Sequence, residues 1–199
     1  MSADDWSLMA RTGEGDRVAF RLLLERHGPA SLRLATRCLG TAGQAEDIVQ
    51  EAFLRVWREA PRWRPQARLS TWLYRVVVNL CTDQLRKPRS ESLDLVPEPP
   101  DEREDAETAL HGRQVGALVE RTLAGLPERQ RQAVALCYYE GMTAAEAAEV
   151  LDLSPSAVEA LLHRARRSLR EELAPLLGRP GATGREVVSG ERKDRGLRS

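Results

Sequence analysis

The chain has 199 residues, of which 42% are hydrophobic, so it can form one sizeable domain or two small ones. Thirty basic residues balance thirty acidic ones, and a net charge of zero is unfavourable for a DNA partner, because affinity for DNA comes largely from neutralised phosphates. The charges are unevenly distributed, however. Acidic residues crowd into 91–107 and basic residues into 62–89 and 163–170, so local charge leaves DNA binding open.

Membrane spans, disulfides and metal sites are not indicated. No stretch reaches the run of about 18 apolar residues that a membrane helix needs, and residues 1–16 are acidic and polar, unlike a signal peptide. We therefore expect a cytoplasmic protein without direct membrane insertion. Cys38, Cys81 and Cys137 are far apart in apolar helical patterns, so we interpret them as buried thiols and expect no metal or cofactor. A redox- or metal-sensing role for them is the less favoured alternative.

An N-terminal extension over 1–13 precedes a helical segment at 14–87, which contains four helical patterns and no strand pattern. The patterns are separated by breaks at Gly28–Pro29, Gly40 to Gly43 and Pro61 to Pro65.

The third pattern, over 45–57, predicts an amphipathic helix. Its apolar side is formed by Ala45, Ile48, Val49, Ala52, Phe53 and Val56. Its outer side carries Asp47, Gln50, Glu51, Leu54 and Arg58. An exposed leucine among charged residues hints at a protein contact surface.

The fourth helix begins at Ser70 or Thr71. Its packing side is Leu73, Val76, Val77 and Leu80, with Gln84 at the far end. The opposite side, which we call the α4 stripe, presents Thr71, Arg75, Asn79, Thr82 and Arg86. Arginines and Trp63 in the preceding loop would suit stacking on unpaired bases and phosphate contacts. On residue types alone, a tryptophan packed into the core beside a solvated face is the better interpretation.

The segment 88–107 contains Pro88, Pro97, Pro99 and Pro100, the acidic cluster and little apolar material, so it is a linker and the chain has two domains. Residues 108–124 again show a helical pattern, a helix restarts at Leu126–Pro127, and Gly141 stops it. After Gly178 no periodicity remains, and we expect the tail over 178–199 to be disordered.

Residues 143–170 predict a helix-turn-helix. Thr143 and Glu146 form a capping box, Asp152 lies in the turn, and Ser154 with Pro155 begins the second helix. One side of that helix packs through Val158, Leu162, Ala165 and Leu169, with Leu161 at its edge. The other side presents Ser156, Ala160, His163 and Arg167, flanked by Arg164 and Arg170, as a helix in a major groove would. The alternative is an ordinary amphipathic helix with a solvated basic side.

The order of these motifs resembles the extracytoplasmic-function class of bacterial sigma factors, which keep only conserved regions 2 and 4. The resemblance rests on AEDIVQEAFLRVW, STWLYRVVVNLCTDQLRK, the acidic linker, LPERQRQAVAL and the final HRARRSLR, and covers about residues 14–175. It implies an all-α fold, with region 2 at 14–87 on the β′ clamp of core RNA polymerase and region 4 at 108–177 on the β flap. It further implies promoter DNA as a partner, an anti-sigma factor as regulator, and a linker that threads toward the RNA exit path.

The resemblance also assigns residues. The region that binds core polymerase corresponds to Asp47, Gln50, Glu51, Leu54 and Arg58. Minus-10 DNA would be bound by Arg62, Trp63, Arg64, Arg68, Thr71, Arg75, Asn79 and Arg86. Minus-35 DNA would be bound by Ser154, Ser156, Ala157, Glu159, Ala160, His163, Arg164 and Arg167. Glu159 and Leu161 stand where many relatives carry Lys or Arg, and Asp152 replaces a turn glycine, so minus-35 specificity should differ.

Two other classes of function compete with this interpretation. A LuxR- or GerE-type regulator has a similar helix-turn-helix, but residues 14–87 lack the strand pattern and pocket-sized apolar surplus of a sensor domain. Enzyme activity is not expected, because His27, His111 and His163 are scattered and no nucleophile lies at motif spacing from a base.

Overall fold

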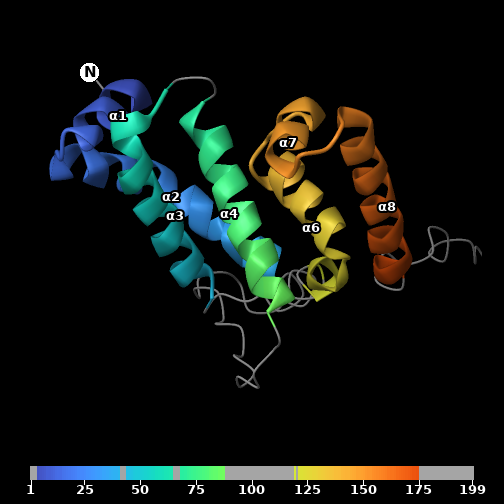
Figure 1. Ribbon diagram of the computed structural model, residues 1–199. Coiled ribbons are helices and arrows are strands. Elements are labelled where there is room, and N and C mark those ends of the chain that lie inside the picture. The colour runs from blue at the N-terminus through green and yellow to red at the C-terminus, as the bar shows by residue number, and fades with distance from the viewer. Residues whose placement is uncertain (1–3, 41–43, 65–67, 88–118, 120, 175–199) are drawn as a thin grey trace, which may run out of the picture.

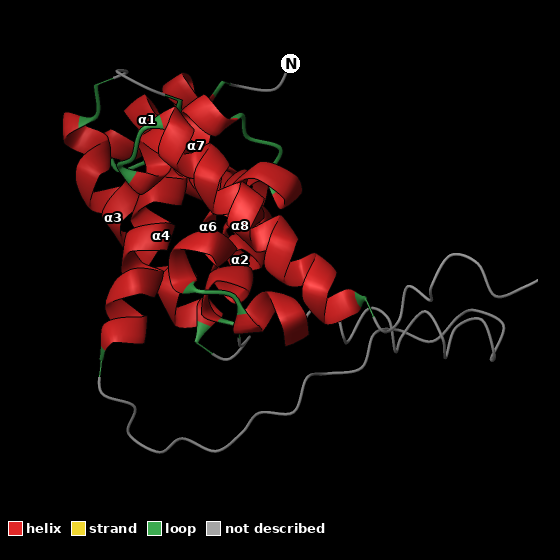
Figure 2. Ribbon diagram, turned by 90° about the vertical axis from the view of Figure 1, so that its right-hand side faces the viewer, coloured by secondary structure: helices red, strands yellow, loops and turns green. Residues whose placement is uncertain are grey.

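The computed structural model describes residues 4–40, 44–64, 68–87, 119 and 121–174 (Figure 1). Within these residues the fold is all-α, as predicted, and Figure 2 shows only helices and loops. The helices are α1 (Asp5–Gly13), α2 (Arg17–Leu39), α3 (Ala45–Glu59), α4 (Leu69–Arg86), α6 (Glu128–Val134), α7 (Ala144–Leu151) and α8 (Pro155–Leu173). The linker 88–107, the tail 178–199 and most of the helix expected over 108–124 lie outside the described residues.

Helix α1 lies within the segment that the sequence marked only as an extension. Asp4 caps its N-terminus, and Leu8 and Met9 are buried against α2 and the short 3₁₀ turn Ala60–Arg62. Two aspartates tie its ends to α2, since Asp5 pairs with Arg26 at 2.5 Å and with His27 at 2.9 Å. The N-terminal segment is therefore part of the first helical unit.

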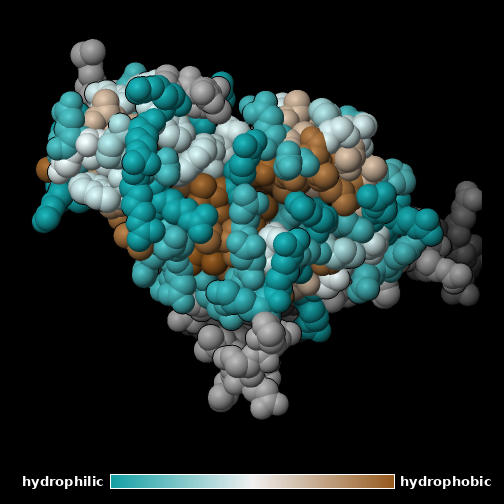
Figure 3. All heavy atoms as spheres, viewed as in Figure 1, coloured by the Kyte–Doolittle hydropathy of each residue, from teal (hydrophilic) through white to brown (hydrophobic). Residues whose placement is uncertain are grey.

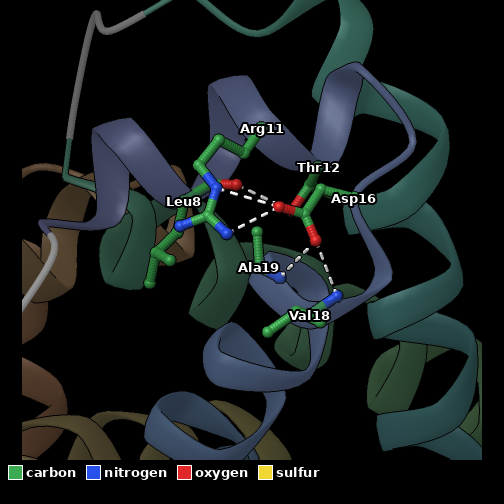
Figure 4. A network of polar contacts seen from close by, with 6 residues as sticks. All are labelled: Leu8, Arg11, Thr12, Asp16, Val18 and Ala19. Atoms are coloured by element: carbon green, nitrogen blue, oxygen red, sulfur yellow. Dashed lines mark hydrogen bonds and ion pairs between the residues drawn. The ribbon is translucent and has the colours of Figure 1, made fainter.

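Asp16 joins the end of α1 to the start of α2 (Figure 4). One carboxylate oxygen accepts hydrogen bonds from the backbone N–H groups of Val18 at 2.8 Å and Ala19 at 3.1 Å. The other accepts from the Arg11 guanidinium at 2.6 and 2.9 Å. The Ala19 backbone bond and then the Arg11 side chain lower the pKa of Asp16, because both stabilise the charged carboxylate.

The predicted break at Gly28–Pro29 is wrong, because α2 runs without interruption through it. Proline removes one backbone hydrogen bond, which usually ends or bends a helix. Here Ala19 and Leu23 before the proline, and Leu34 and Cys38 after it, are buried in the same core. Burial on both sides outweighs the local defect, because most helical stability in proteins comes from packing of an apolar face.

Helices α3 and α4 pack on α2, and their predicted apolar sides are confirmed. Ile48, Phe53 and Val56 of α3 are buried, as are Leu73 and Val77 of α4. The aromatic rings of Phe20 and Phe53 meet edge to face at 6.3 Å, and those of Phe20 and Trp57 at 5.1 Å.

The second helical unit contains α6, α7 and α8. A π-helical turn over Ala135–Tyr139 extends α6, and Gly141 with φ 68° ends it, as predicted. Helix α8 packs against α6 and α7 through Val158, Leu162 and Ala165.

The two units touch. Helix α4 lies against α7, and α2 lies against α6 and the π-helical turn, so the buried apolar residues of both units form one continuous cluster (Figure 1). We call this contact the domain interface. Among the described residues, none of the helices is long and apolar enough to cross a bilayer.

Candidate nucleic-acid and protein interfaces

The helix-turn-helix has the local geometry that its sequence predicts. The Thr143 hydroxyl accepts from the Glu146 N–H at 3.2 Å, and the Glu146 carboxylate accepts from the Thr143 N–H at 2.9 Å. These bonds complete the capping box and lower the pKa of Glu146. Asp152 adopts φ 54° in the turn, a left-handed conformation that aspartate tolerates better than most non-glycine residues. The Ser154 hydroxyl then accepts from the Ala157 N–H at 3.2 Å and begins α8.

The outer side of α8, which we call the recognition face, points to solvent. Its exposed members are Ser154, Ser156, Glu159, His163, Arg164 and Arg167, while Ala157 and Ala160 are half-buried. Arg167 donates to Glu171 one turn further on at 2.9 Å, and this bond raises the pKa of Arg167. Such an exposed ion pair is worth little, so DNA phosphate can replace the carboxylate at small cost.

The outer side of α3 is exposed as the helical pattern predicts. Asp47, Gln50 and Arg58 are exposed, Glu51 is half-buried, and the Leu54 side chain is 48% exposed. Glu51 accepts from Arg55 at 3.1 Å and lies 3.9 Å from Arg58. Hydrophilic residues dominate the surface over α3 in Figure 3, and apolar side chains reach the surface between α3 and α4 and over α7.

Of the residues assigned to minus-10 DNA, six are exposed: Arg62, Arg64, Arg68, Arg75, Asn79 and Arg86. Trp63 is half-buried and packs edge to face on Trp72 at 5.1 Å between ring centroids. The tryptophan therefore occupies the packed position that its residue type favoured.

The prediction of a wholly solvated α4 stripe is wrong at two positions. Thr71 is only 9% exposed and Thr82 only 8% exposed. Both lie on the side of α4 that meets the second unit, together with Val78, which is 1% exposed. A helical wheel built from α4 alone places this side in solvent, because it contains no information about α6 and α7. The apolar Val78 beside the stripe was the one local sign of burial.

Several polar bonds cross the domain interface, and the sequence did not identify them. Arg75 donates through Nε to the Glu149 carbonyl at 3.0 Å, and through its terminal nitrogen to the same oxygen. Tyr74 donates to Glu140 at 3.1 Å; burial and then this carboxylate raise the pKa of Tyr74 to about 12. The Arg131 guanidinium donates to the Cys38 carbonyl at 2.9 Å.

The cysteines are only partly as expected. Cys38 and Cys81 are buried, whereas Cys137 is half-buried. A hydrogen bond with Cys81 and then burial raise the pKa of Cys38 well above its ordinary value. Burial also raises the pKa of Cys137. These shifts keep both thiols protonated and therefore poorly nucleophilic. Within the described part of the chain, no group of three or more His, Cys, Asp or Glu side chains could hold a metal ion.

Comparisons with known proteins agree with this arrangement. Family models match residues 23–91 as Sigma-70 region 2 and residues 117–169 as Sigma-70, region 4. The ECF RNA polymerase sigma-E factor of Escherichia coli strain K12 is 30% identical over 186 residues, which span 88% of this chain and 97% of that protein.

Two further matches extend the comparison. The ECF RNA polymerase sigma factor SigE of Mycolicibacterium smegmatis is 33% identical over 156 residues; these are 76% of this chain but only 60% of that protein. The solved structure of CnrH in complex with the cytosolic domain of CnrY superposes with a TM-score of 0.63 at 30% identity, and covers 86% of this chain and 97% of CnrH. The chain belongs to the extracytoplasmic-function family of RNA polymerase sigma factors.

Proposed function

We propose that this sigma factor binds core RNA polymerase in the cytoplasm and directs initiation from particular promoters through two separate DNA-binding surfaces. The observation that carries the proposal is the recognition face of α8, which projects arginines from a correctly capped helix-turn-helix. The domain limits proposed are 14–87 for region 2, 88–107 for the linker and 108–177 for region 4. The matches over 23–91 and 117–169 support this division.

The outer side of α3 is the proposed docking surface for the polymerase β′ clamp. Leu54 supplies apolar area at its centre, and Asp47, Gln50, Glu51 and Arg58 supply a polar surround. Interfaces with an apolar centre and a polar rim are typical of stable protein complexes. Region 4 would dock on the β flap while its recognition face remains available to minus-35 DNA.

Minus-10 DNA is proposed to bind along the exposed arginines of the 62–68 segment and the exposed part of the α4 stripe. Separating a base from its stack costs a few kcal/mol, which the protein offsets by capturing the extruded base. Arg64 and Asn79 are exposed and able to hydrogen-bond a base edge. The protein therefore acts by binding, and the polymerase performs the chemistry.

An anti-sigma factor is the proposed regulatory partner. Support comes from CnrH, whose structure was solved with the cytosolic domain of a second protein, CnrY. The family resemblance points the same way.

Reconstituted run-off transcription tests the proposal. Purified protein added to core polymerase should produce transcripts of defined length from a subset of genomic fragments, and core polymerase alone should not. Tight binding to duplex DNA without polymerase, combined with failure to programme initiation on any fragment, would instead support a one-component LuxR- or GerE-type regulator.

A further inference from the structure

We propose that the sigma factor by itself is self-inhibited: its region 4 unit packs over the α4 stripe and withholds part of the minus-10 surface until polymerase separates the two units. The proposal rests on the proposed function for the role of the stripe. The closed arrangement itself follows from contacts between α2 and α4 on one side and α6 and α7 on the other.

The first contact engages an arginine that would otherwise face DNA. Arg75 directs both donor groups at the Glu149 carbonyl, in the last turn of α7. Carbonyls of a last helical turn lack a partner within the helix and carry partial negative charge, so a guanidinium binds them well. Arg68 also faces region 4, since it lies 3.9 Å from Glu146. Two cations of the minus-10 surface are thus directed at α7 instead of phosphate.

The second contact buries the stripe itself. The Thr82 hydroxyl donates to Glu128 at 2.5 Å and accepts from the Gln132 amide at 2.9 Å. Gln132 is 0% exposed, and the neighbouring Val78 of α4 is 1% exposed. No nucleic acid can reach Thr82 or Thr71 while α6 and α7 occupy this side of α4.

The third contact is electrostatic and fastens α2 to the end of α6. The Glu140 side chain is 5% exposed, accepts from Tyr74 and lies 3.8 Å from Arg37. The Arg37 guanidinium also stacks over the Tyr139 ring at 3.9 Å from its centroid. A cation over an aromatic ring and a carboxylate at its edge hold it from two sides.

The interface has the chemistry of a contact that separates. Arg37 Nη1, Glu140 Oε1 and Gln132 Oε1 are buried but make no hydrogen bond in the closed arrangement. Such atoms gain water partners when the units part, which offsets part of the lost contact. Interfaces between domains of one chain are generally polar and permit relative movement.

Closure leaves the other surfaces available. The outer side of α3 and the recognition face of α8 stay exposed. The closed protein can therefore engage polymerase first through α3 and expose the rest of the stripe afterwards. If about nine-tenths of the free protein is closed, its apparent affinity for minus-10 DNA is about tenfold below that of the open form.

A charge exchange at Arg37 and Glu140 tests the closed state, since neither residue belongs to the proposed DNA or polymerase surfaces. Glu140→Lys and Arg37→Glu each place like charges together, whereas the double exchange restores opposite charges at the original net charge. Glu149→Lys is the control for added positive charge, because it keeps the backbone carbonyl that binds Arg75. Circular dichroism verifies that each variant is folded.

Two quantities are measured on the full chain: the radius of gyration from small-angle X-ray scattering, and the affinity for a single-stranded minus-10 oligonucleotide from fluorescence anisotropy. Both single variants should expand and bind about tenfold more tightly. The double exchange and Glu149→Lys should stay compact and bind like the wild type. A wild-type chain that is already extended, or folded single variants that remain as compact and as weakly binding as the wild type, would overturn closure.

Run-off transcription by the wild type separates this proposal from the proposed function. Active wild type whose single variants neither expand nor bind more tightly refutes closure alone. Inactive wild type refutes the function, while scattering still decides whether the free chain is closed.

Discussion

The amide of Gln132 and the hydroxyl of Thr82 are 2.9 Å apart across the boundary between α6 and α4, and both side chains are buried. The Glu128 carboxylate accepts from the two of them, at 2.8 Å from the amide and 2.5 Å from the hydroxyl. Three polar groups from two helices therefore satisfy one another where each alone would be costly to bury.

Gln132→Ala should reduce the free energy of unfolding by about 1–3 kcal/mol, because it leaves Thr82 and Glu128 without a buried donor. Urea denaturation followed by circular dichroism measures the change. The matched control is Gln50→Ala on the exposed side of α3, which should stay within about 0.5 kcal/mol of the wild type. Equal loss in both variants would show that the network does not stabilise the fold.

Thr82 also shows where prediction from the sequence stopped. Its place on the polar side of α4 followed from helical periodicity, and the same reasoning correctly placed Leu54 and Arg58 in solvent on α3. Periodicity describes the sides of one helix, whereas the burial of Thr82 depends on α6, which follows about 40 residues later in the chain. Contacts of that kind are not encoded in local spacing.

The capping motifs behaved differently. Thr143, Glu146, Ser154 and Asp152 all have the predicted geometry, because each satisfies backbone groups within a few residues of itself. Gly28–Pro29 misled for the opposite reason: a strong local break signal was overridden by burial on both sides of it. Local chemistry therefore predicted helix starts well, and packing decided helix continuity.

Leu54→Asp should weaken assembly with core polymerase at least about tenfold while leaving the domain folded. The side chain is 48% exposed, so a charge costs little in the free protein but several kcal/mol in a desolvated interface. Fluorescence titration with core polymerase measures the affinity. Leu32→Asp, at another exposed leucine on α2, is the control and should bind normally. Unchanged affinity of the Leu54 variant would remove α3 from the docking surface.

Stability should fall at acid pH through Asp16. Its pKa is lowered in the folded state, so the unfolded chain binds the proton more readily. The stabilisation is therefore complete above the ordinary aspartate pKa of about 3.9 and is lost as pH falls through the lower folded value. Urea midpoints measured across this range should decline less steeply in Asp16→Asn than in the wild type. Asp83→Asn, at an exposed position of α4, should keep the wild-type slope.

Asn79→Ala should impair promoter opening more than duplex binding, because Asn79 is exposed on α4 and an amide can pair with a base edge. Permanganate reactivity of thymines in the open complex measures opening, and a gel-shift titration measures duplex binding. Gln84→Ala, a half-buried amide on the packing side of the same helix, is the control. If mutant and wild type open matched and mismatched minus-10 sequences equally, Asn79 makes no contact there.

Two substitutions on the recognition face should have different effects. Arg167 lies far along α8 and should contact phosphate, so Arg167→Ala should weaken binding about equally on all minus-35 variants and reduce the salt slope by about one unit. Glu159 lies near the N-terminus of α8, and Glu159→Lys should alter discrimination by about 1–3 kcal/mol at one or two base pairs if it reaches a base edge.

Salt titrations over a small library of minus-35 variants compare the two, and Glu171→Gln supplies a third arm. Glu171 accepts the 2.9 Å hydrogen bond of Arg167 in the free protein, so its neutralisation should strengthen promoter binding slightly without changing base preference. Because the Arg167–Glu171 pair is exposed, its loss should not affect the unfolding transition. Altered base preference in Arg167→Ala, together with uniform loss in Glu159→Lys, would mean that α8 enters the groove rotated from the orientation deduced from its exposed side.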